Sequence, residues 1–192
     1  MFQVVQYPEL PGLYILKLPQ IQDFRQVLLE MDDYVIVMDA PPEQAPAVVD
    51  WARKNLGKPI GQVWPTHHHH DHAFGVKTYS QAGATVVVPE MAKEYYSNIP
   101  GIKFETYIAK KPYVAETTNF RATSIHLECS VHAADFTISV IMPPCPTTNS
   151  TVVIFDSDHV IQSERMPIHD DHTVIEEFIA AVSQYCLASQ SV

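Results

Sequence analysis

The chain has 192 residues, of which 46% are apolar and 18% are charged, a composition typical of a globular domain. Its formal net charge of −10 at pH 7 argues against nucleic acid or an anionic membrane as the main partner, because both require a basic surface. At this length roughly 70% of the unfolded surface can be buried, so the core needs no disulfide bonds.

The three cysteines, Cys129, Cys145 and Cys186, are scattered and form no C-x-x-C pair. Reduced thiols in a cytosolic protein are the simplest interpretation. The first residues contain neither a basic segment nor a long apolar run, so we expect no secretory signal. No stretch approaches the ~20 apolar residues of a membrane-spanning helix. We therefore expect a cytoplasmic protein.

The first half of the chain alternates predicted strands and helices. The apolar runs 26–31 and 34–38 are joined by Asp32-Asp33, a polar pair typical of a tight hairpin. Residues 43–56 carry apolar side chains at helical spacing, and Gly57 ends that helix. The elements predicted in this half are strands at 13–18, 26–31, 34–38, 60–64 and 85–88, and helices at 43–56, 73–82 and 90–97.

The second half is predicted to be mainly strands, at 104–109, 120–127, 136–142 and 152–155. A last helix, over 172–187, is expected to begin after Asp170 or Asp171 and to pack its apolar stripe on a sheet. Two sheets packed face to face with helices outside accommodate this order. We expect one domain over residues 1–192.

The segment 66–72, Thr-His-His-His-His-Asp-His, contains five histidines and one aspartate in six consecutive positions. It follows the apolar stretch 60–64, which places it at the mouth of a buried strand, where open α/β sheets hold their sites. Imidazole and carboxylate bind borderline cations such as Zn²⁺. The alternative is a solvated histidine-rich loop, but this pattern directly after a strand favours a metal site.

Spacing divides the cluster into two pairs. Residues two apart in an extended segment point the same way, so His67 and His69 would hold one metal from the same side. Asp71 and His72 follow, where the chain turns toward the helix 73–82, and would face a second metal. Three further histidines are expected at the surface or behind the ligands: His68 and His70 of this cluster, and His159 farther along the chain.

At this cluster the sequence resembles the metallo-β-lactamase-fold hydrolases, whose Thr-His-x-His-x-Asp-His motif is matched at 66–72 without a gap. Other elements follow in the family's order. The strand 34–38 ends in Asp39, like the family's early strand with its structural aspartate, although Ala-Pro-Pro follows here in place of Thr-Gly. Residues 73–76, Ala-Phe-Gly-Val, resemble the Gly-Gly stretch after the motif, with one glycine replaced.

The resemblance implies further ligands in distant segments. The family's third histidine lies on a loop between strands, and His132 fits that place. His126, inside a predicted strand, is the alternative. Asp158 takes the place of the family's metal-bridging aspartate, for which Asp156 is a weaker candidate.

The family's last ligand is a histidine near the C-terminus, after a further helix. The histidines available beyond His159 are His169 and His172, and both precede the predicted helix 172–187. Either one of them substitutes for that ligand, or the ligand and its strand are absent.

The resemblance implies an α/β fold, a four-layer αββα sandwich of two mixed β-sheets with flanking helices. The implied metal ligands come from both halves of the chain: His67, His69 and His132 for one metal, and Asp71, His72 and Asp158 for a second. Metal-bound hydroxide would attack an ester, thioester, lactone or amide. Asp158 would bridge the metals, Asp71 would orient the water if the second metal is weak, and Asp39 would fix a ligand or a loop.

Zinc is the expected cofactor, as one or two ions, and the same donors also suit iron or manganese. A small-molecule substrate is the expected partner, and the oligomeric state stays open, a homodimer included. Two alternatives remain. The protein is a non-hydrolytic metalloenzyme of a biosynthetic pathway, or it is a catalytically impaired metal-binding protein that has lost its last ligand.

Overall fold

The computed structural model describes residues 2–17, 25–158, 160–161, 166–167, 176, 178–181 and 183. Across the first sheet lie β1 (Gln3–Gln6), β2 (Leu13–Lys17), β3 (Arg25–Glu30), β4 (Val35–Met38), β5 (Ile60–Trp64), β6 (Thr85–Pro89) and β7 (Lys103–Tyr107). Across the second lie β11 (Val153–Phe155), β10 (Thr137–Met142), β9 (Arg121–His126) and β8 (Tyr113–Glu116). A separate pair contains β12 (Val160–Ile161) and β13 (Met166–Pro167). The helices are α1 (Ala45–Leu56), α2 (His70–Ala73), α3 (Val76–Gln81), the 3₁₀ turn η1 (Glu90–Ala92) and α4 (Lys93–Tyr96).

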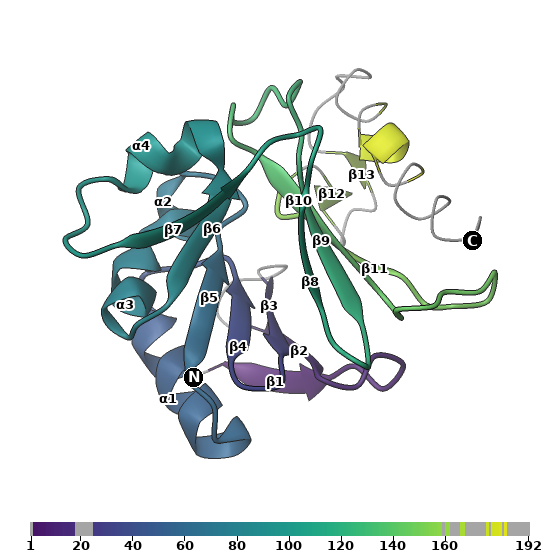
Figure 1. The fold of residues 1–192 in the computed structure, drawn as a ribbon, viewed down its shortest axis with the longest axis horizontal. Coiled ribbons are helices and arrows are strands. Elements are labelled where there is room, and N and C mark those ends of the chain that lie inside the picture. Colours follow the sequence, from purple (N-terminus) through teal and green to yellow (C-terminus); the bar gives the residue numbers. More distant parts are fainter. Residues whose placement is uncertain are drawn as a thin grey trace.

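The first sheet changes direction in its middle. Strands β1 to β4 pair antiparallel, whereas β4 to β7 pair parallel. Parallel neighbours need crossover connections, and helices α1 to α4 supply them on one face of the sheet (Figure 1). Strand β4 reads Val-Ile-Val-Met and is buried at every position, as expected for a strand covered on both faces. The carboxyl ends of β4, β5 and β6 therefore lie at one edge of the sheet.

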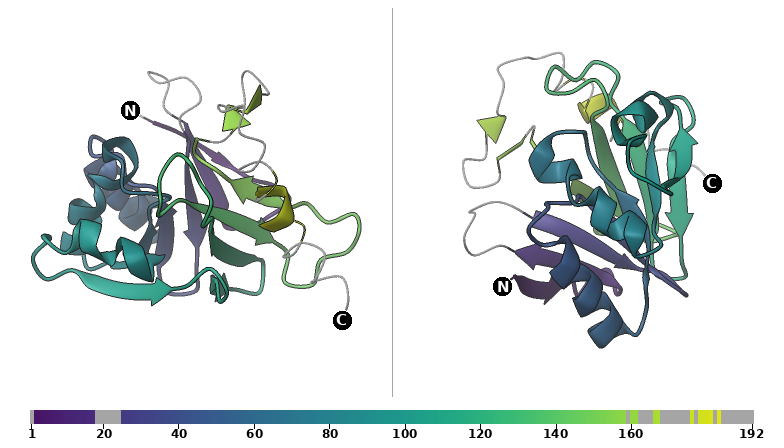
Figure 2. Two further views of the ribbon diagram at one scale, coloured as in Figure 1. Left: turned by 90° about the horizontal axis from the view of Figure 1, so that it is seen from above. Right: turned by 90° about the vertical axis from the view of Figure 1, so that its left-hand side faces the viewer.

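Three buried clusters define the layers. One joins the helices to the first sheet and includes Val48, Val63 and Tyr79. A second lies between the sheets, and a third lies on the outer side of the second sheet, where Phe178 and Ala181 pack against it. Figures 1 and 2 show the same order of helices, sheet, sheet and C-terminal helical segment.

The four-layer α/β sandwich is thus confirmed, with two refinements. The first sheet is mixed, while the described strands of the second are all antiparallel. The helix predicted at 73–82 is two helices, α2 and α3, separated at Gly75. A Cβ atom at Gly75 would lie 2.6 Å from the carbonyl oxygen of Ala40, so only glycine allows this close approach.

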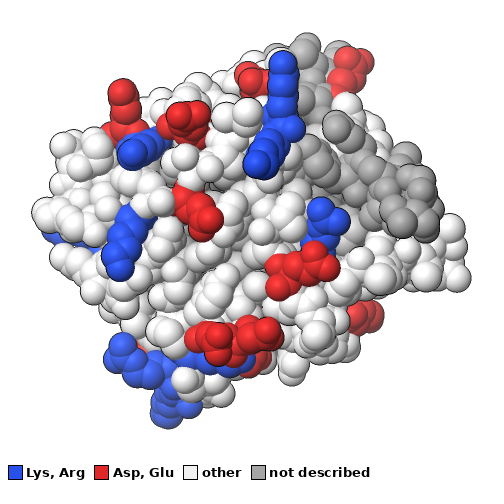
Figure 3. All heavy atoms as spheres, viewed as in Figure 1, with Lys and Arg blue, Asp and Glu red and all other residues white. Residues whose placement is uncertain are grey.

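The helix predicted at 172–187 is described only at residues 176, 178–181 and 183, which are helical. Within the part of the chain that the structure describes, no helix is long and apolar enough to cross a membrane. On the face drawn in Figure 3, lysine and arginine side chains stand among aspartate and glutamate side chains.

Candidate metal centre

The histidine motif occupies the carboxyl end of β5. Pro65 follows this strand directly, and because proline has no N–H to donate, the ladder ends there. After a short loop, α2 begins at His70, three residues earlier than the helix that the sequence pattern predicts. Asp39 stands at the carboxyl end of the neighbouring strand β4. The motif and this aspartate therefore share one edge of the sheet, where ligand sites of open α/β sheets lie.

Three imidazoles from two distant segments form a first group of donors. One ring nitrogen from each of His67, His69 and His132 lies within 4.8 Å of the others. The Nε2 atoms of His67 and His132 are 3.2 Å apart. His67 is buried, and the other two rings are half-buried. Three convergent imidazoles with one partly open side match the donor set of a catalytic zinc.

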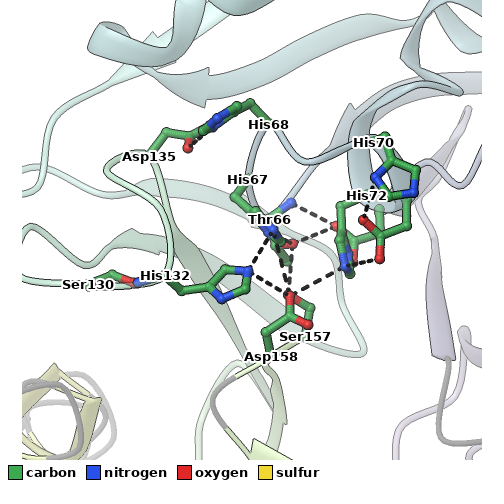
Figure 4. Close-up of polar contacts among 12 residues, drawn as sticks. Thr66, His67, His68, His70, His72, Ser130, His132, Asp135, Ser157 and Asp158 are labelled. Atoms are coloured by element: carbon green, nitrogen blue, oxygen red, sulfur yellow. Dashed lines mark hydrogen bonds and ion pairs between the residues drawn. The ribbon is translucent and has the colours of Figure 1, made fainter. Parts of the chain in front are cut away.

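A second group shares His67 with the first and adds His72 and Asp158. Asp158 Oδ2 lies 3.3 Å from His72 Nε2, and 3.7 Å from the Nε2 atoms of both His67 and His132. Figure 4 shows these side chains turned toward one another. A carboxylate oxygen beside imidazoles of both groups is placed where a ligand shared by two cations would stand.

Asp39 organises both groups from behind. Its Oδ2 lies 2.7 Å from His72 Nδ1, and its Oδ1 accepts hydrogen bonds from Thr66 N at 2.7 Å and Thr66 Oγ1 at 2.8 Å. Thr66 Oγ1 in turn lies 3.1 Å from His67 Nδ1. With the Nδ1 hydrogens donated in this direction, both histidines present an Nε2 lone pair to the site.

The backbone of Asp39 adopts a left-handed conformation, with φ of 64°, which is uncommon outside glycine but tolerated by aspartate. Two hydrogen bonds hold it there. Asp39 N donates to Trp64 O at 3.0 Å, and Asp39 O accepts from Gln26 Nε2 at 2.8 Å. Next to it, Ala40 N donates to His72 O at 2.7 Å, so the loop after β4 is fastened directly to α2.

Burial and neighbouring charges shift the pKa values of the two buried histidines, His67 and His72, in opposite directions. Burial, and after it the neighbouring imidazoles with His72 first among them, lower the pKa of His67 to about 2. Burial also lowers the pKa of His72, but the carboxylates of Asp39, first among them, Asp158 and Asp71 together outweigh it, and the net pKa is raised to about 9. His67 is therefore neutral and ready to bind a cation, whereas a cation must displace a proton from His72.

The structure separates the other candidates. His126 Nε2 donates to the carbonyl of Ala134, at 2.8 Å, and belongs to neither donor group, so His132 takes the place beside His67. Asp71 stands outside both groups, but its Oδ2 lies 3.4 Å from His72 Nε2 and its side chain is half-exposed. Asp156 is also outside both groups. Three further sequence candidates lie outside the described residues: His159, His169 and His172.

Residues that the sequence pattern does not single out also build the centre. Ser157 Oγ donates to Asp158 Oδ2 at 2.8 Å and lies 3.0 Å from Thr66 Oγ1. The ring of Phe136 stacks on His67, with ring centroids 5.1 Å apart. Asp135 Oδ1 lies 2.7 Å from His68 Nδ1. Of these residues, Ser157 has a signal in the sequence, because it stands between the two candidate aspartates, Asp156 and Asp158.

Comparison with known proteins agrees with this geometry. The family model of the metallo-beta-lactamase superfamily matches residues 26–158, more than half of the chain. No curated protein sequence matches it. The matched range contains the motif, His132 and Asp158.

Several solved structures share the fold. A B3 metallo-beta-lactamase with an active-site glutamic acid gives a TM-score of 0.63 at 16% identity, over 94% of this chain and 74% of that one. The subclass B3 metallo-beta-lactamase BJP-1 of Bradyrhizobium japonicum gives 0.57 at 16% identity, over 93% and 72%. A metallo-beta-lactamase from Pontibacter korlensis gives 0.62 at 13% identity, over 96% and 86%. At these identities the likeness shows the fold alone.

Proposed function

Because the chain belongs to the metallo-beta-lactamase superfamily, we propose that it is a metal-dependent hydrolase of an ester, thioester, lactone or amide. The observation that carries the proposal is the position of Asp158. Its Oδ2 atom lies within 3.7 Å of Nε2 atoms of three histidines that come from two segments. A set of imidazoles around one carboxylate is the chemistry that holds a pair of divalent cations.

The proposed ligands divide as the two donor groups do. His67, His69 and His132 would hold one cation, and His72 with Asp158 would hold the second. Bound there, a divalent cation supplies Lewis acidity for a carbonyl oxygen and lowers the pKa of water. The rest of the work falls to the protein. Asp39 keeps the Nε2 lone pairs turned inward, because its carboxylate accepts from His72 and from Thr66.

Asp71 is proposed to act on the water that attacks the substrate. Its side chain is half-exposed at the rim and lies 3.4 Å from His72 Nε2, so it can accept a hydrogen bond from a water molecule at the centre. Asp158 would supply a carboxylate ligand beside imidazoles of both donor groups. Ser157 Oγ donates to the same Oδ2 oxygen and so restricts its position.

We further propose zinc as the metal, a small-molecule substrate and a cytoplasmic location. The described donors near the centre are imidazoles and carboxylates, without a thiolate, which suits zinc and also iron or manganese. Elemental analysis of the purified protein separates zinc from iron, and thereby a hydrolase from a metalloenzyme of oxidative chemistry.

The test is hydrolysis of a panel that contains an aryl ester, an aryl thioester, a lactone and a β-lactam. The β-lactam is included because the structural neighbours are named metallo-beta-lactamases. The double variant His67→Ala, His69→Ala should lose hydrolysis and bound zinc together. His70→Ala is the matched control from the same motif, because that side chain is 75% exposed and belongs to neither donor group. Unchanged hydrolysis in the double variant would refute the proposal.

A further inference from the structure

The start of β10 contacts the histidine motif residue by residue. Thr137 donates to the carbonyl of Thr66 through its N–H, at 2.8 Å, and through its hydroxyl, at 3.2 Å. Two residues back along the chain, Asp135 Oδ1 lies 2.7 Å from His68 Nδ1. The two segments therefore run antiparallel and side by side, although the strands that they adjoin, β5 and β10, belong to different sheets.

Between these polar contacts lies an aromatic one. The Phe136 ring stacks on His67, with an interplanar angle of 24°, and meets His132 edge-on at 5.8 Å. Phe136 is fully buried. Residues 135–137 thus contact residues 66–68 at each step, and their middle member touches two of the proposed ligands.

The carboxylate of Asp135 is buried where it contacts His68. The Asp135 side chain is 2% exposed, and a carboxylate removed from water requires a hydrogen-bond donor. A carboxylate can only accept, so His68 Nδ1 carries the hydrogen. The Tyr95 ring stacks on His68 at 4.1 Å and 13°, and covers one face of that ring.

The other histidine of the motif that is not a proposed ligand, His70, provides a contrast. His70 has a 75% exposed side chain, and its Nδ1 lies 3.6 Å from the half-exposed Asp71, a pair of little energetic weight in water. Figure 4 shows His68 turned away from the ligand cluster toward Asp135. Two identical side chains in one motif therefore have different surroundings.

We propose that His68 and Asp135 are positioning residues that set the place of His132 relative to His67 and His69. Asp135 stands three residues after His132 on the connection between β9 and β10. Its bond to His68 fastens this connection to the residue that lies between the other two ligands in the sequence. The base of the connection is closed by the bond from Leu127 N to Phe136 O, at 2.9 Å. These two bonds restrict the position of the connection that carries His132.

This inference rests on the proposed function in one respect, namely that these three histidines bind a cation. Its test compares His68→Gln with His68→Asn, and uses His70→Gln as control. The asparagine amide nitrogen stands where Nδ1 stands in histidine, so His68→Asn keeps the donor to Asp135. The longer glutamine side chain carries its amide one bond farther out and misplaces that donor.

Two readouts that need no substrate report the result. They are zinc affinity by competition with a chelator, and the visible spectrum of the cobalt-loaded protein, which reports the coordination geometry. We expect zinc affinity to fall about 10- to 100-fold in His68→Gln, as for other residues that orient ligands, with an altered cobalt spectrum. His68→Asn should restore both to within a few-fold, and His70→Gln should match the wild type. Affinities are measured below each variant's unfolding transition.

Asp135→Asn is the second variant, because it keeps the volume and one acceptor oxygen but loses the charge that strengthens the bond. We expect a smaller loss of zinc affinity in the same direction. The inference is overturned if His68→Gln and Asp135→Asn both bind zinc as tightly as His70→Gln and keep its cobalt spectrum. A wild type that binds no zinc overturns this inference and the proposed function together. A wild type that binds zinc without hydrolysing any substrate overturns the proposed function alone.

Discussion

Replacing Asp39 by asparagine tests whether one buried carboxylate prepares both cation sites. The variant keeps the volume of the side chain, and asparagine tolerates the left-handed backbone at this position as aspartate does. Its amide has one acceptor oxygen and one NH₂ group. If the oxygen accepts from Thr66, the NH₂ group faces His72 Nδ1, which lies 2.7 Å from the native carboxylate. His72 must then accept at Nδ1 and carry its hydrogen at Nε2, where the lone pair for a cation is needed.

Two magnitudes follow from this geometry. Loss of a residue that orients a ligand lowers metal affinity about 10- to 100-fold. The second magnitude concerns the protein stripped of metal, in which Asp39 is the largest of the causes that raise the pKa of His72, against burial, to about 9. A pKa raised to this level from its usual 6.5 corresponds to roughly 3 kcal/mol of stability.

The sign of the pH dependence is fixed by the direction of each pKa. His72 is protonated more readily in the folded protein, so its contribution is complete below pH 6.5 and is lost as pH rises toward 9. His67 acts oppositely, since its lowered pKa reduces stability as pH falls below 6.5. The stripped wild type should therefore lose stability between pH 6.5 and 9, and Asp39→Asn should lose most of this slope.

The assays are zinc competition titrations at neutral pH and urea unfolding of the stripped protein from pH 6 to 9.5. Asp50→Asn, on the exposed face of α1, removes the same charge and should behave as the wild type. The reasoning fails if Asp39→Asn keeps native zinc affinity, or if its stability falls with pH as steeply as that of the wild type.

Three further predictions concern the same centre. Asp158→Asn weakens the carboxylate oxygen that lies beside imidazoles of both donor groups, so elemental analysis should show bound zinc falling from two ions toward one. Unchanged stoichiometry would contradict a role of Asp158 at both cations. Gly75→Ala places a methyl group 2.6 Å from Ala40 O and should lower the free energy of unfolding, measured in urea, by about 1–3 kcal/mol. An unchanged free energy would mean that the loop after β4 moves aside at little cost. Zinc at 100 times its dissociation constant should stabilise the stripped protein by about 2.7 kcal/mol in thermal unfolding; no shift would exclude specific binding.

Much of the first sheet is predictable because its signals are local. Residues 34–38 and 60–64 are apolar runs with clear ends, and they match β4 and β5 closely. The His-x-His-x-Asp-His spacing follows the second of these runs directly, so the side of the sheet that carries the motif is also predictable. Short edge strands are less predictable: β1 has no fully buried residue and β8 has one, so neither shows the longer apolar run of the central strands.

The parts of the centre that sequence reasoning misses depend on tertiary contacts. His68 looks like a spacer until its partner Asp135, 67 residues away, is seen beside it. The other buried residues of β3 are apolar, and the bond from Gln26 to the carbonyl of Asp39 has no sequence signature. The start of α2 at His70 differs from the prediction because histidines do not mark a helix start, whereas the loop after β4 fastens the α2 backbone.

The sharing of the centre between the two sheets also bears on folding. His67 and His132 meet across a sequence separation of 65 residues, and Thr66 meets Ser157 across 91. In a chain in which only the first sheet has formed, His67, His69 and His72 would be in place, but His132 and Asp158 would not. Such long-range contacts form late, since closing long loops costs entropy before the contacts reward it. The recovery of high zinc affinity during refolding therefore reports when the two sheets dock. The recovery of the spectroscopic signal of β-structure does not report this step by itself.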